Sequence, residues 1–446
     1  MAVVRTAGID NVLPHLRDRR PVWYAADVYL DRRFYEFNDV LGSHRFSLVP
    51  ATGFFIFRGL LSMARTPDSQ KGKTMLNKHL LVASALIAAC LAQPAAARDR
   101  QEVSVCEQTA DTMLHACRYD VRDDYYETLA NCKNLASRSE RRACYWEAHN
   151  AKREDSRFCG DVKEARVEAC EVLNEDRYDT DPLLVNDFID PDLVPDVYAP
   201  NPYVSVVAGH TYVLRAGEEG EETVVVHVTE DTREILGVMC RVVVDIVVEE
   251  SIEDGEVEYE AVEVTDDWFA QTVNGDVVYC GEVARNFEDG VLRNLDGSFE
   301  AGIDFAKSGV IVHQTPVWGE AHRQEFSLGE AEDIVQYIGM ETGPSEEEGG
   351  NVENEKYSCG TDKCLRTFDF APIDPESTEY KYYLPGTGFV LAVAMEDGEL
   401  TDEREELMCV GDSLDVLSDD MDCGIADPEL LLEELCALSP DAFCSD

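Results

Sequence analysis

EVEYEAVEVTDDWFAQTVNGDVVYC, at residues 256–280, is the longest run of this sequence that predicts one continuous piece of structure. Glutamates alternate with apolar residues as far as Ala261, which is typical of a strand with one buried face. The apolar side chains then move to Val262 and Val264, and this change of face indicates a β-bulge. Asn-Gly at 274–275 predicts a type I′ hairpin turn, because both central residues of that turn need a positive φ.

Strand-like runs on both sides of this hairpin extend it into an antiparallel β domain over residues 203–396. The runs are short, turn pairs such as Asp-Gly separate them, and no long helical period lies between them. This pattern favours a meander, a half-barrel or a barrel-like sheet over a parallel α/β fold. The expected strands are 203–207, 212–215, 223–229, 235–239, 241–248, 322–327, 333–338, 365–370, 380–383 and 389–394.

Six cysteines in residues 98–175 predict a helical hairpin before the β domain, so the fold class is α+β. Their spacings of 11, 15, 12, 15 and 11 residues are palindromic, in Ala-, Glu- and Arg-rich sequence that favours helix. Residues with a constant index sum lie opposite one another in an antiparallel helix pair, so we expect a turn near Arg138. Zinc binding is disfavoured because CxxC pairs are absent. The predicted disulfides are Cys106–Cys170, Cys117–Cys159 and Cys132–Cys144.

The remaining segments are acidic. Residues 176–202 contain several prolines and are expected to be a solvated linker, and residues 397–446 are expected to be a C-terminal tail. Two disulfides are predicted in the β domain, Cys240–Cys280 and Cys359–Cys364. The tail holds four more cysteines whose pairing the sequence leaves open, namely Cys409, Cys423, Cys436 and Cys444.

Residues 75–97 predict a secretory signal peptide. Lys78 supplies a basic start, residues 80–91 are apolar, and three alanines at 95–97 form a cleavage site. Because this signal is internal, we expect translation to start at Met75 and residues 1–74 to be a mis-assigned extension. The alternative is a real cytoplasmic extension followed by a short signal anchor.

Cys90 follows Ile-Ala-Ala and resembles the lipidated cysteine of bacterial lipoproteins, so it is a lipidation candidate. The alternative is that Cys90 is removed with the signal peptide. Both readings leave an even number of cysteines, as expected of an oxidised exported protein. The expected location is the periplasm, the outer membrane as a lipoprotein, or the extracellular space.

The amino-acid composition limits the classes of partner that the protein is expected to bind. The 446 residues carry a net charge of −52, and 45% of them are hydrophobic, which is enough for real cores. Such an acidic surface repels phosphates and anionic membranes, so we expect no nucleic-acid partner and no membrane contact apart from a lipid anchor at Cys90. The acidic surface is compatible with binding of cations or cationic partners. The simpler interpretation is that it is only a solvated surface.

Several stretches resemble a family of uncharacterised exported bacterial proteins that combine a Cys-rich helical hairpin with a β domain. The stretches are NPY at 201–203, GVMCRVVV at 237–244, DDWFAQTVNGDVVYCGE at 266–282, GSFEAGID at 297–304, RQEFSLGEAED at 323–333 and EYKYYLPGTGFV at 379–390. KYYLPGTGFV is also similar to a segment of periplasmic half-barrel proteins related to lipoprotein carriers. That second resemblance implies a curved antiparallel sheet holding an apolar ligand.

Catalytic motifs are not supported. Gly-Asp-Ser-Leu at 411–414 matches the block of a family of esterases, but the last histidine, His322, precedes it, so Ser413 has no downstream base. His322 and Glu325 have an H-x-x-E spacing, which on a strand places them on opposite faces. We therefore assign no catalytic residue, no metal ligand and no cofactor.

Aromatic residues are the candidates for a ligand-binding groove, with core filling as the alternative. The sequence thus favours an exported, non-enzymatic binding or structural protein of the bacterial envelope, whose β domain binds an apolar ligand or an envelope protein. The alternatives are a secreted hydrolase that uses paired carboxylates and a calcium-dependent surface protein. The ligand candidates are Trp268, Tyr279, Trp318, Phe326 and Tyr382.

Overall fold

The computed structural model describes residues 104–217, 220–253, 255–288, 290–341, 357, 359–360, 363–396, 398–418 and 421–444. The expected extension, the signal peptide and Cys90 lie outside these residues. The helical elements are α2 (Val105–Asn134), α3 (Arg138–Leu173), α4 (Pro182–Val185), η1 (Pro191–Leu193), η4 (Leu414–Leu417), α5 (Pro428–Leu438) and α6 (Pro440–Phe443). The strands are β1 (Thr211–Gly217), β2 (Glu222–Ile235), β3 (Val238–Glu253), β4 (Glu256–Gln271), β5 (Val277–Glu288), β6 (Val291–Asn294), β7 (Phe299–Glu300), β8 (Lys307–Val312), β9 (Ala321–Arg323), β10 (Glu325–Phe326), β11 (Ile334–Glu341), β12 (Cys364–Ala371), β13 (Asp374–Leu384), β14 (Gly388–Glu396) and β15 (Glu399–Gly411).

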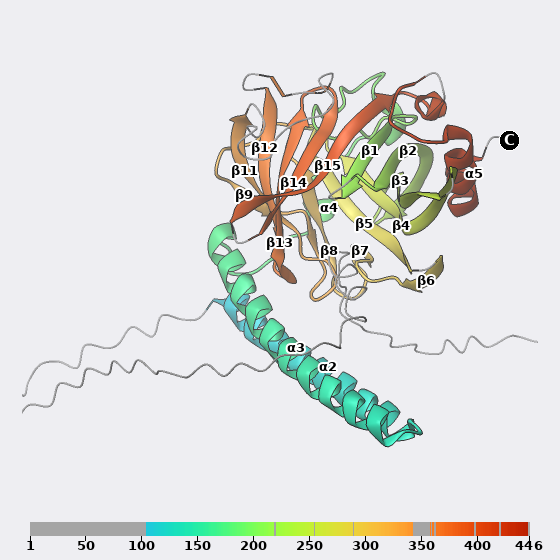
Figure 1. The fold of residues 1–446 in the computed structure, drawn as a ribbon. Coiled ribbons are helices and arrows are strands. Elements are labelled where there is room, and N and C mark those ends of the chain that lie inside the picture. Colours follow the sequence, from blue (N-terminus) through green and yellow to red (C-terminus); the bar gives the residue numbers. More distant parts are fainter. Residues whose placement is uncertain are drawn as a thin grey trace, which may run out of the picture. The chain divides into compact units, whose positions relative to one another are not determined.

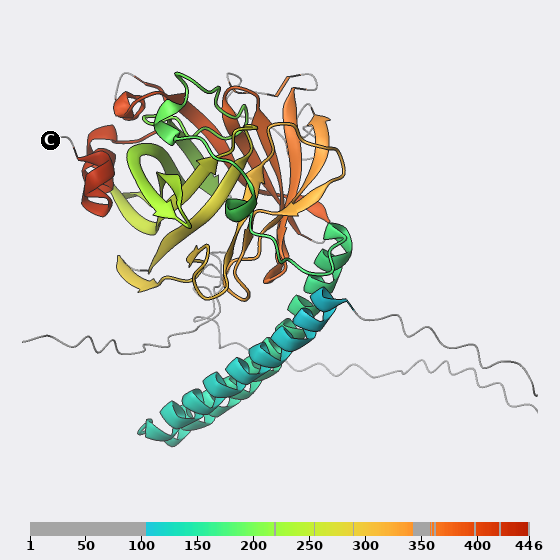
Figure 2. The same cartoon turned by 180° about the vertical axis from the view of Figure 1, so that it is seen from behind.

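Helices α2 and α3 form the predicted antiparallel hairpin and run side by side in both views (Figures 1 and 2). Each helix begins at a capping box, in which a serine and a glutamate three residues later satisfy each other's backbone N–H groups. The caps are Ser104 with Glu107 and Ser137 with Glu140. The hairpin contains the disulfides Cys106–Cys170, Cys117–Cys159 and Cys132–Cys144, in the pairing that the palindromic spacing predicts.

One large antiparallel sheet follows the hairpin and nearly closes into a barrel (Figure 1). Its strand order is β10-β8-β5-β4-β3-β2-β1-β15-β14-β13-β12-β11-β9, with β6 and β7 paired to β5. The strands at the two ends of this order, β10 and β9, are neighbours in sequence. Because β9 pairs with β11 and β10 pairs with β8, this short stretch brings the two edges of the sheet together.

The opening stretch forms β4 and β5, with the bulge where the alternation predicts it. Val247 and Val248 of β3 are adjacent, yet they pair with Glu263 and Ala261, so Val262 is the extra residue of the bulge. The hairpin turn is present, but its predicted type is wrong. Gly275 has φ +95° whereas Asn274 is not among the positive-φ residues, and the Gly275 N–H donates to the Thr272 carbonyl. A type I turn followed by a left-handed glycine explains this geometry.

Three other expectations for the β domain differ from the structure. Residues 203–207 are not a strand, because Tyr203 and Val206 are buried by packing rather than by strand pairing. Residues 236–237 make the turn between β2 and β3 instead of lying in a strand. The acidic start of the expected tail forms β15, which pairs with β1 and β14 and so joins the two halves of the sheet.

The stretch at 176–202 has mostly exposed side chains, but a few of its residues anchor it to the sheet. Leu183, Ile189 and Val194 are buried, and Phe188 forms a β-bridge with Thr272 at the end of the β4–β5 hairpin. Together with Tyr203 and other nearby residues, this stretch joins a core cluster inside the sheet.

The C-terminal helices cover the outer face of β1 to β4 (Figure 1). Leu431 and Leu435 of α5 and Phe443 of α6 pack on a layer of sheet residues that includes Val225 and Ile246. The structure pairs the cysteines that the sequence left open as Cys409–Cys423 and Cys436–Cys444, and it contains Cys240–Cys280 and Cys359–Cys364 as predicted.

These seven disulfides of the described residues fit an extracellular or periplasmic location. Across the same residues, no helix has both the length and the apolar character that a membrane span requires.

Candidate functional site

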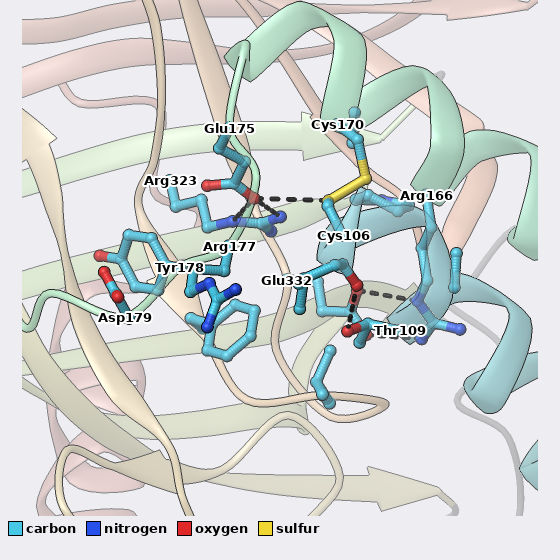
Figure 3. Close-up of a pocket in the computed structure, with 16 residues that line it drawn as sticks. Cys106, Thr109, Arg166, Cys170, Glu175, Arg177, Tyr178, Asp179, Arg323 and Glu332 are labelled. Atoms are coloured by element: carbon cyan, nitrogen blue, oxygen red, sulfur yellow. Dashed lines mark hydrogen bonds and ion pairs between the residues drawn. A yellow bond between two sulfur atoms is a disulfide. The ribbon is translucent and has the colours of Figure 1, made fainter. Parts of the chain in front are cut away.

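Two hollows in the described part of the chain are candidates for a ligand site. One, of about 200 Å³, lies where the hairpin meets the β domain (Figure 3). Arg166 of α3 reaches Glu332 there, with Nε 2.9 Å from Oε2 and Nη2 2.5 Å from Oε1. Both residues are buried, and Glu332 also accepts a hydrogen bond from the Gly329 N–H at 2.7 Å. Arg166 and Glu332 therefore form a bidentate ion pair, which fixes the geometry of the contact as well as pairing the charges.

A second ion pair lies beside the first in the same hollow. Glu175 and Arg323 point toward one another, with Arg323 Nε 3.0 Å from Glu175 Oε1 (Figure 3). The Arg323 guanidinium also lies 5.0 Å from the ring centre of Phe326, and Tyr178 donates to the Ser308 carbonyl at 2.7 Å. The two buried arginines of this hollow are therefore each paired with a glutamate. The hollow is best explained as the structural joint between hairpin and sheet.

The other hollow is a cavity of about 270 Å³ inside the curled sheet, which we call the lumen. Its walls come from β1 to β4, from β8, from β13 to β15 and from residues 203–205. The apolar part of the wall includes Tyr212, Leu214, Val226, Val243, Phe269 and Phe389. Tyr203 and Val206 pack with Tyr337, Leu365 and Tyr383 beside it.

Strand alternation places carboxylates on the same inner face. In the β3–β4 pair, Val243 lies opposite Asp267, and Asp245 follows Val243 by two residues. Side chains two residues apart on a strand point to the same side, so Asp245 and Asp267 are diagonal neighbours facing the lumen. Both line the cavity, together with Glu405 of β15.

Asp245 is the least compensated of these groups. Its Oδ1 is buried and has no hydrogen-bond partner. Burial raises the pKa of Asp245 well above its usual range, and the charges of Asp267 and Glu405 raise it further. Burial likewise raises the pKa of Glu405 to about 7, although Lys381 opposes that shift.

Asp267 has one donor. The Tyr279 O–H donates to Asp267 Oδ1, and this hydrogen bond lowers the pKa of the carboxyl group. Burial outweighs it, with a smaller contribution from Glu263, so the pKa of Asp267 is raised to about 7. Tyr279 in turn stacks on Phe269, with ring centres 4.8 Å apart.

Lys381 is the lumen-lining cation, and its charge is already engaged. Its Nζ lies 3.0 Å from Glu379 Oε1 and 3.8 Å from Asp369 Oδ2. Burial alone would lower the pKa of Lys381, but these two carboxylates raise it well above its usual range. The ammonium group therefore compensates its own neighbours on β12 and β13 before it compensates Asp245.

Other carboxyl groups of the β domain, outside the lining of the lumen, also have raised pKa values. Burial is the largest cause of a raised pKa in each, followed by neighbouring charges for several of them. Even so, the described residues contain no group of three or more His, Cys, Asp or Glu side chains arranged to hold a metal ion. The additional groups are Glu222, Glu263, Glu282, Glu325, Asp333 and Asp369.

The aromatic ligand candidates do not gather in one place. Trp268 is buried beside the Cys240–Cys280 disulfide, with the Arg233 guanidinium 4.0 Å from its ring centre. Phe326 belongs to the joint with the hairpin. Tyr382 is buried in a different core cluster from Trp268, and the Trp318 side chain is exposed. Tyr279 contacts the lumen wall through Phe269 and Asp267.

The Gly-Asp-Ser-Leu block has a structural role. Ser413 caps η4 by accepting a hydrogen bond from the Asp415 N–H. His210 Nδ1 lies 3.1 Å from Asp412 Oδ1, so the fold does bring a histidine to this block, but it pairs with the aspartate.

The sequence contains a sign of the lumen apart from its aromatic residues. Asp245 interrupts the apolar run VVVDIVV at 242–248, where a charged residue is unexpected. A buried charge in a central strand is expensive unless it is paired, so such a position marks a site that has a further role. Lys381 in the run YKYYL at 380–384 is a similar signal.

Comparisons with known proteins add little. No protein-family model matches the sequence, and no curated protein matches it. Among solved structures, the chain is similar to a protein from Bacteroides fragilis that is described as exported and as having a YmcC-like fold. The two share 12% identity with a TM-score of 0.25, over 48% of this chain and 97% of that chain. A likeness at that score carries no argument about the fold or function of this chain.

Proposed function

We propose that this chain is an exported, non-enzymatic binding protein of the bacterial envelope, and that its barrel-like sheet binds a small ligand in the lumen. A lipid on Cys90 would hold it at a membrane surface. One observation carries the proposal, namely the cavity of about 270 Å³ with an apolar wall and a few polar groups. Ligand sites in proteins have this combination, and the volume lies just below their usual range of about 300–1,000 Å³, so the ligand is expected to be small.

The surroundings of the lumen support this function. The other hollow is a joint in which each of the two buried arginines forms an ion pair with a glutamate, although Arg323 Nη1 has no hydrogen-bond partner there. In the lumen, Asp245 has an oxygen without a hydrogen-bond partner, and the charges that act on this carboxyl group are negative ones. Buried polar atoms are nearly always hydrogen-bonded, so an unpartnered one beside a cavity indicates a place for a ligand.

Native mass spectrometry of protein purified from its own host tests the proposal. We expect a small molecule that co-purifies with the protein and is released on unfolding. Val226 lines the cavity and is half-buried, so Val226→Trp should fill the space and abolish the bound mass. Val291→Trp is the matched control, because Val291 is exposed on β6.

The comparison of the two variants decides the outcome. A bound mass lost in Val226→Trp and kept in Val291→Trp supports the lumen as the site. A mass that survives in both variants, while both still melt cooperatively, places the ligand elsewhere and contradicts the proposal.

Acid–base hydrolysis is a second candidate, because the raised pKa values of Asp267 and Glu405 lie near neutrality, as those of catalytic acids do. Native mass spectrometry separates it from binding. A co-purified molecule that stays intact through repeated incubation at neutral pH favours binding, whereas its stoichiometric cleavage, lost in Asp267→Asn, favours hydrolysis.

A further inference from the structure

Among the described residues, the lumen is lined by three carboxyl groups, Asp245, Asp267 and Glu405, and by one cationic side chain, Lys381. Lys381 Nζ lies 3.0 Å from Glu379 Oε1 and 3.8 Å from Asp369 Oδ2, and its charge also lowers the pKa of Glu405. Asp267 receives a neutral hydrogen bond from Tyr279, which satisfies an oxygen but supplies no positive charge. Asp245 Oδ1 has no partner. A cationic donor is therefore the missing partner of this wall.

We propose that the lumen binds an organic cation, a protonated amine that carries an apolar group. This inference rests on the proposed function and adds the charge of the ligand to it. The ammonium group donates to the carboxylates of Asp245 and Asp267. The apolar group lies against Val226, Val243 and Phe269, which line the same cavity.

The geometry favours an organic cation over a metal ion. Calcium takes six to eight oxygen ligands at short range. The described residues hold no group of three or more candidate ligands arranged for a metal, although three carboxyl groups line the lumen. Separated carboxylates beside an apolar wall instead suit a ligand with one charged end and one apolar end.

The proposed binding of an ammonium group should depend on pH, because it is coupled to the release of protons from the carboxyl groups. Without a cation, burial favours the neutral form of these carboxyl groups, and the pKa of Asp267 is about 7. An ammonium group binds the ionised form, so binding releases protons, and affinity rises with pH through this range. A neutral ligand of the same shape has no such dependence.

Three probes with the same apolar body isolate the charge, namely phenylbutylamine, phenylbutanol and phenylbutyrate. Isothermal titration calorimetry on the full chain at near-physiological salt measures each one at about pH 8 and about pH 5. We expect the amine to bind at least about tenfold more tightly than the alcohol at the higher pH, and this advantage to shrink at the lower pH. The butyrate should bind most weakly.

Asp245→Asn tests the residue. It should lower the affinity of the amine about tenfold or more while leaving the alcohol unchanged. It should also raise the melting temperature of the ligand-free protein at about pH 8, because the fold no longer has to keep this carboxyl group protonated above the pKa that an unfolded aspartate has. These opposite effects on binding and stability cannot arise from misfolding. Glu405→Gln is the second lumen variant if the first does not fold, since Glu405 lines the same cavity.

The matched control is Glu258→Gln, on β4 and exposed to solvent. It removes one negative charge from an acidic protein without touching the lumen, so it should leave amine binding unchanged. An equal loss in Glu258→Gln and Asp245→Asn would show that the amine binds the acidic surface in general, and this would overturn the inference.

The remaining outcomes are also decisive. Amine and alcohol of equal affinity would overturn the charge inference and leave the binding function in place. Binding of none of the three probes at millimolar concentration would count against both. Calcium chloride that raises the melting temperature of the parent but not of Asp245→Asn, together with no binding of the amine, would assign the site to a metal ion and overturn the organic cation.

Discussion

Buried carboxylates are paired with arginines at the joint between hairpin and sheet, whereas two carboxyl groups of the lumen have no cationic partner among the described residues. At the joint, Arg166 forks onto Glu332 and Arg323 pairs with Glu175. In the lumen, Asp245 has a buried oxygen without a partner, and Asp267 has a neutral donor. Paired charges of the first kind fix the relation between two elements, whereas uncompensated charges of the second kind weaken the fold unless they serve another purpose. The difference separates a structural joint from a candidate site, although both are hollows.

Breaking the joint should give the largest effect. Arg166→Ala leaves the Glu332 carboxylate buried and alone, so we expect a loss of about 3–5 kcal/mol in the free energy of unfolding. Urea titration followed by circular dichroism measures it. The double variant Arg166→Met with Glu332→Leu removes both charges and should recover most of the loss. A single variant as stable as the parent would show that the fork does not fasten the hairpin.

In the lumen, removal of a charged group should raise the free energy of unfolding, whereas at the joint it should lower it. The folded pKa of Asp267 is about 7, above the value near 4 of an unfolded aspartate. Its stabilising contribution is therefore full below about pH 4 and is lost as the pH rises to about 7. Asp267→Asn should remove that dependence and should be more stable than the parent at about pH 8, by roughly 2–4 kcal/mol.

Unfolding titrations of the parent and Asp267→Asn at several pH values test this sign. Glu258→Gln is again the control, because it removes an equal charge from an exposed position. If the parent and Asp267→Asn lose stability in parallel as the pH rises, Asp267 does not titrate in the folded lumen as proposed.

The sequence predicted the hairpin better than the sheet, for a physical reason. The cysteines that staple α2 to α3 are constrained by a constant index sum, which any antiparallel pair must obey. The bulge at Val262 was likewise visible as a local change of alternation. The sequence did not predict β15, because the first half of this strand is acidic and largely exposed. Its strand form depends on pairing with β14 and with β1, and β1 lies far away in the sequence.

The lumen was harder to foresee than either element. Aromatic residues were chosen as ligand candidates because they dominate binding sites, but they dominate cores as well. Trp268 and Tyr382 became core residues of separate clusters. Which face of a strand lines a cavity depends on closure of the sheet, and closure depends on the pairing of β9 and β10 at its two edges. The charged interruption at Asp245 was the one local sign.

The smallest effect is expected at Trp318, an aromatic candidate that the structure keeps away from both hollows. It is 53% exposed in the segment between β8 and β9 and does not line either hollow. Trp318→Ala should change the free energy of unfolding by less than about 0.5 kcal/mol and leave phenylbutylamine binding unaltered. Phe269→Ala is the contrast, because Phe269 lines the lumen and stacks on Tyr279, and it should weaken binding of both the amine and the alcohol. A loss of probe binding in Trp318→Ala but not in Phe269→Ala would show that the probes bind outside the lumen. The difference in charge pairing between joint and lumen would then not identify the binding site.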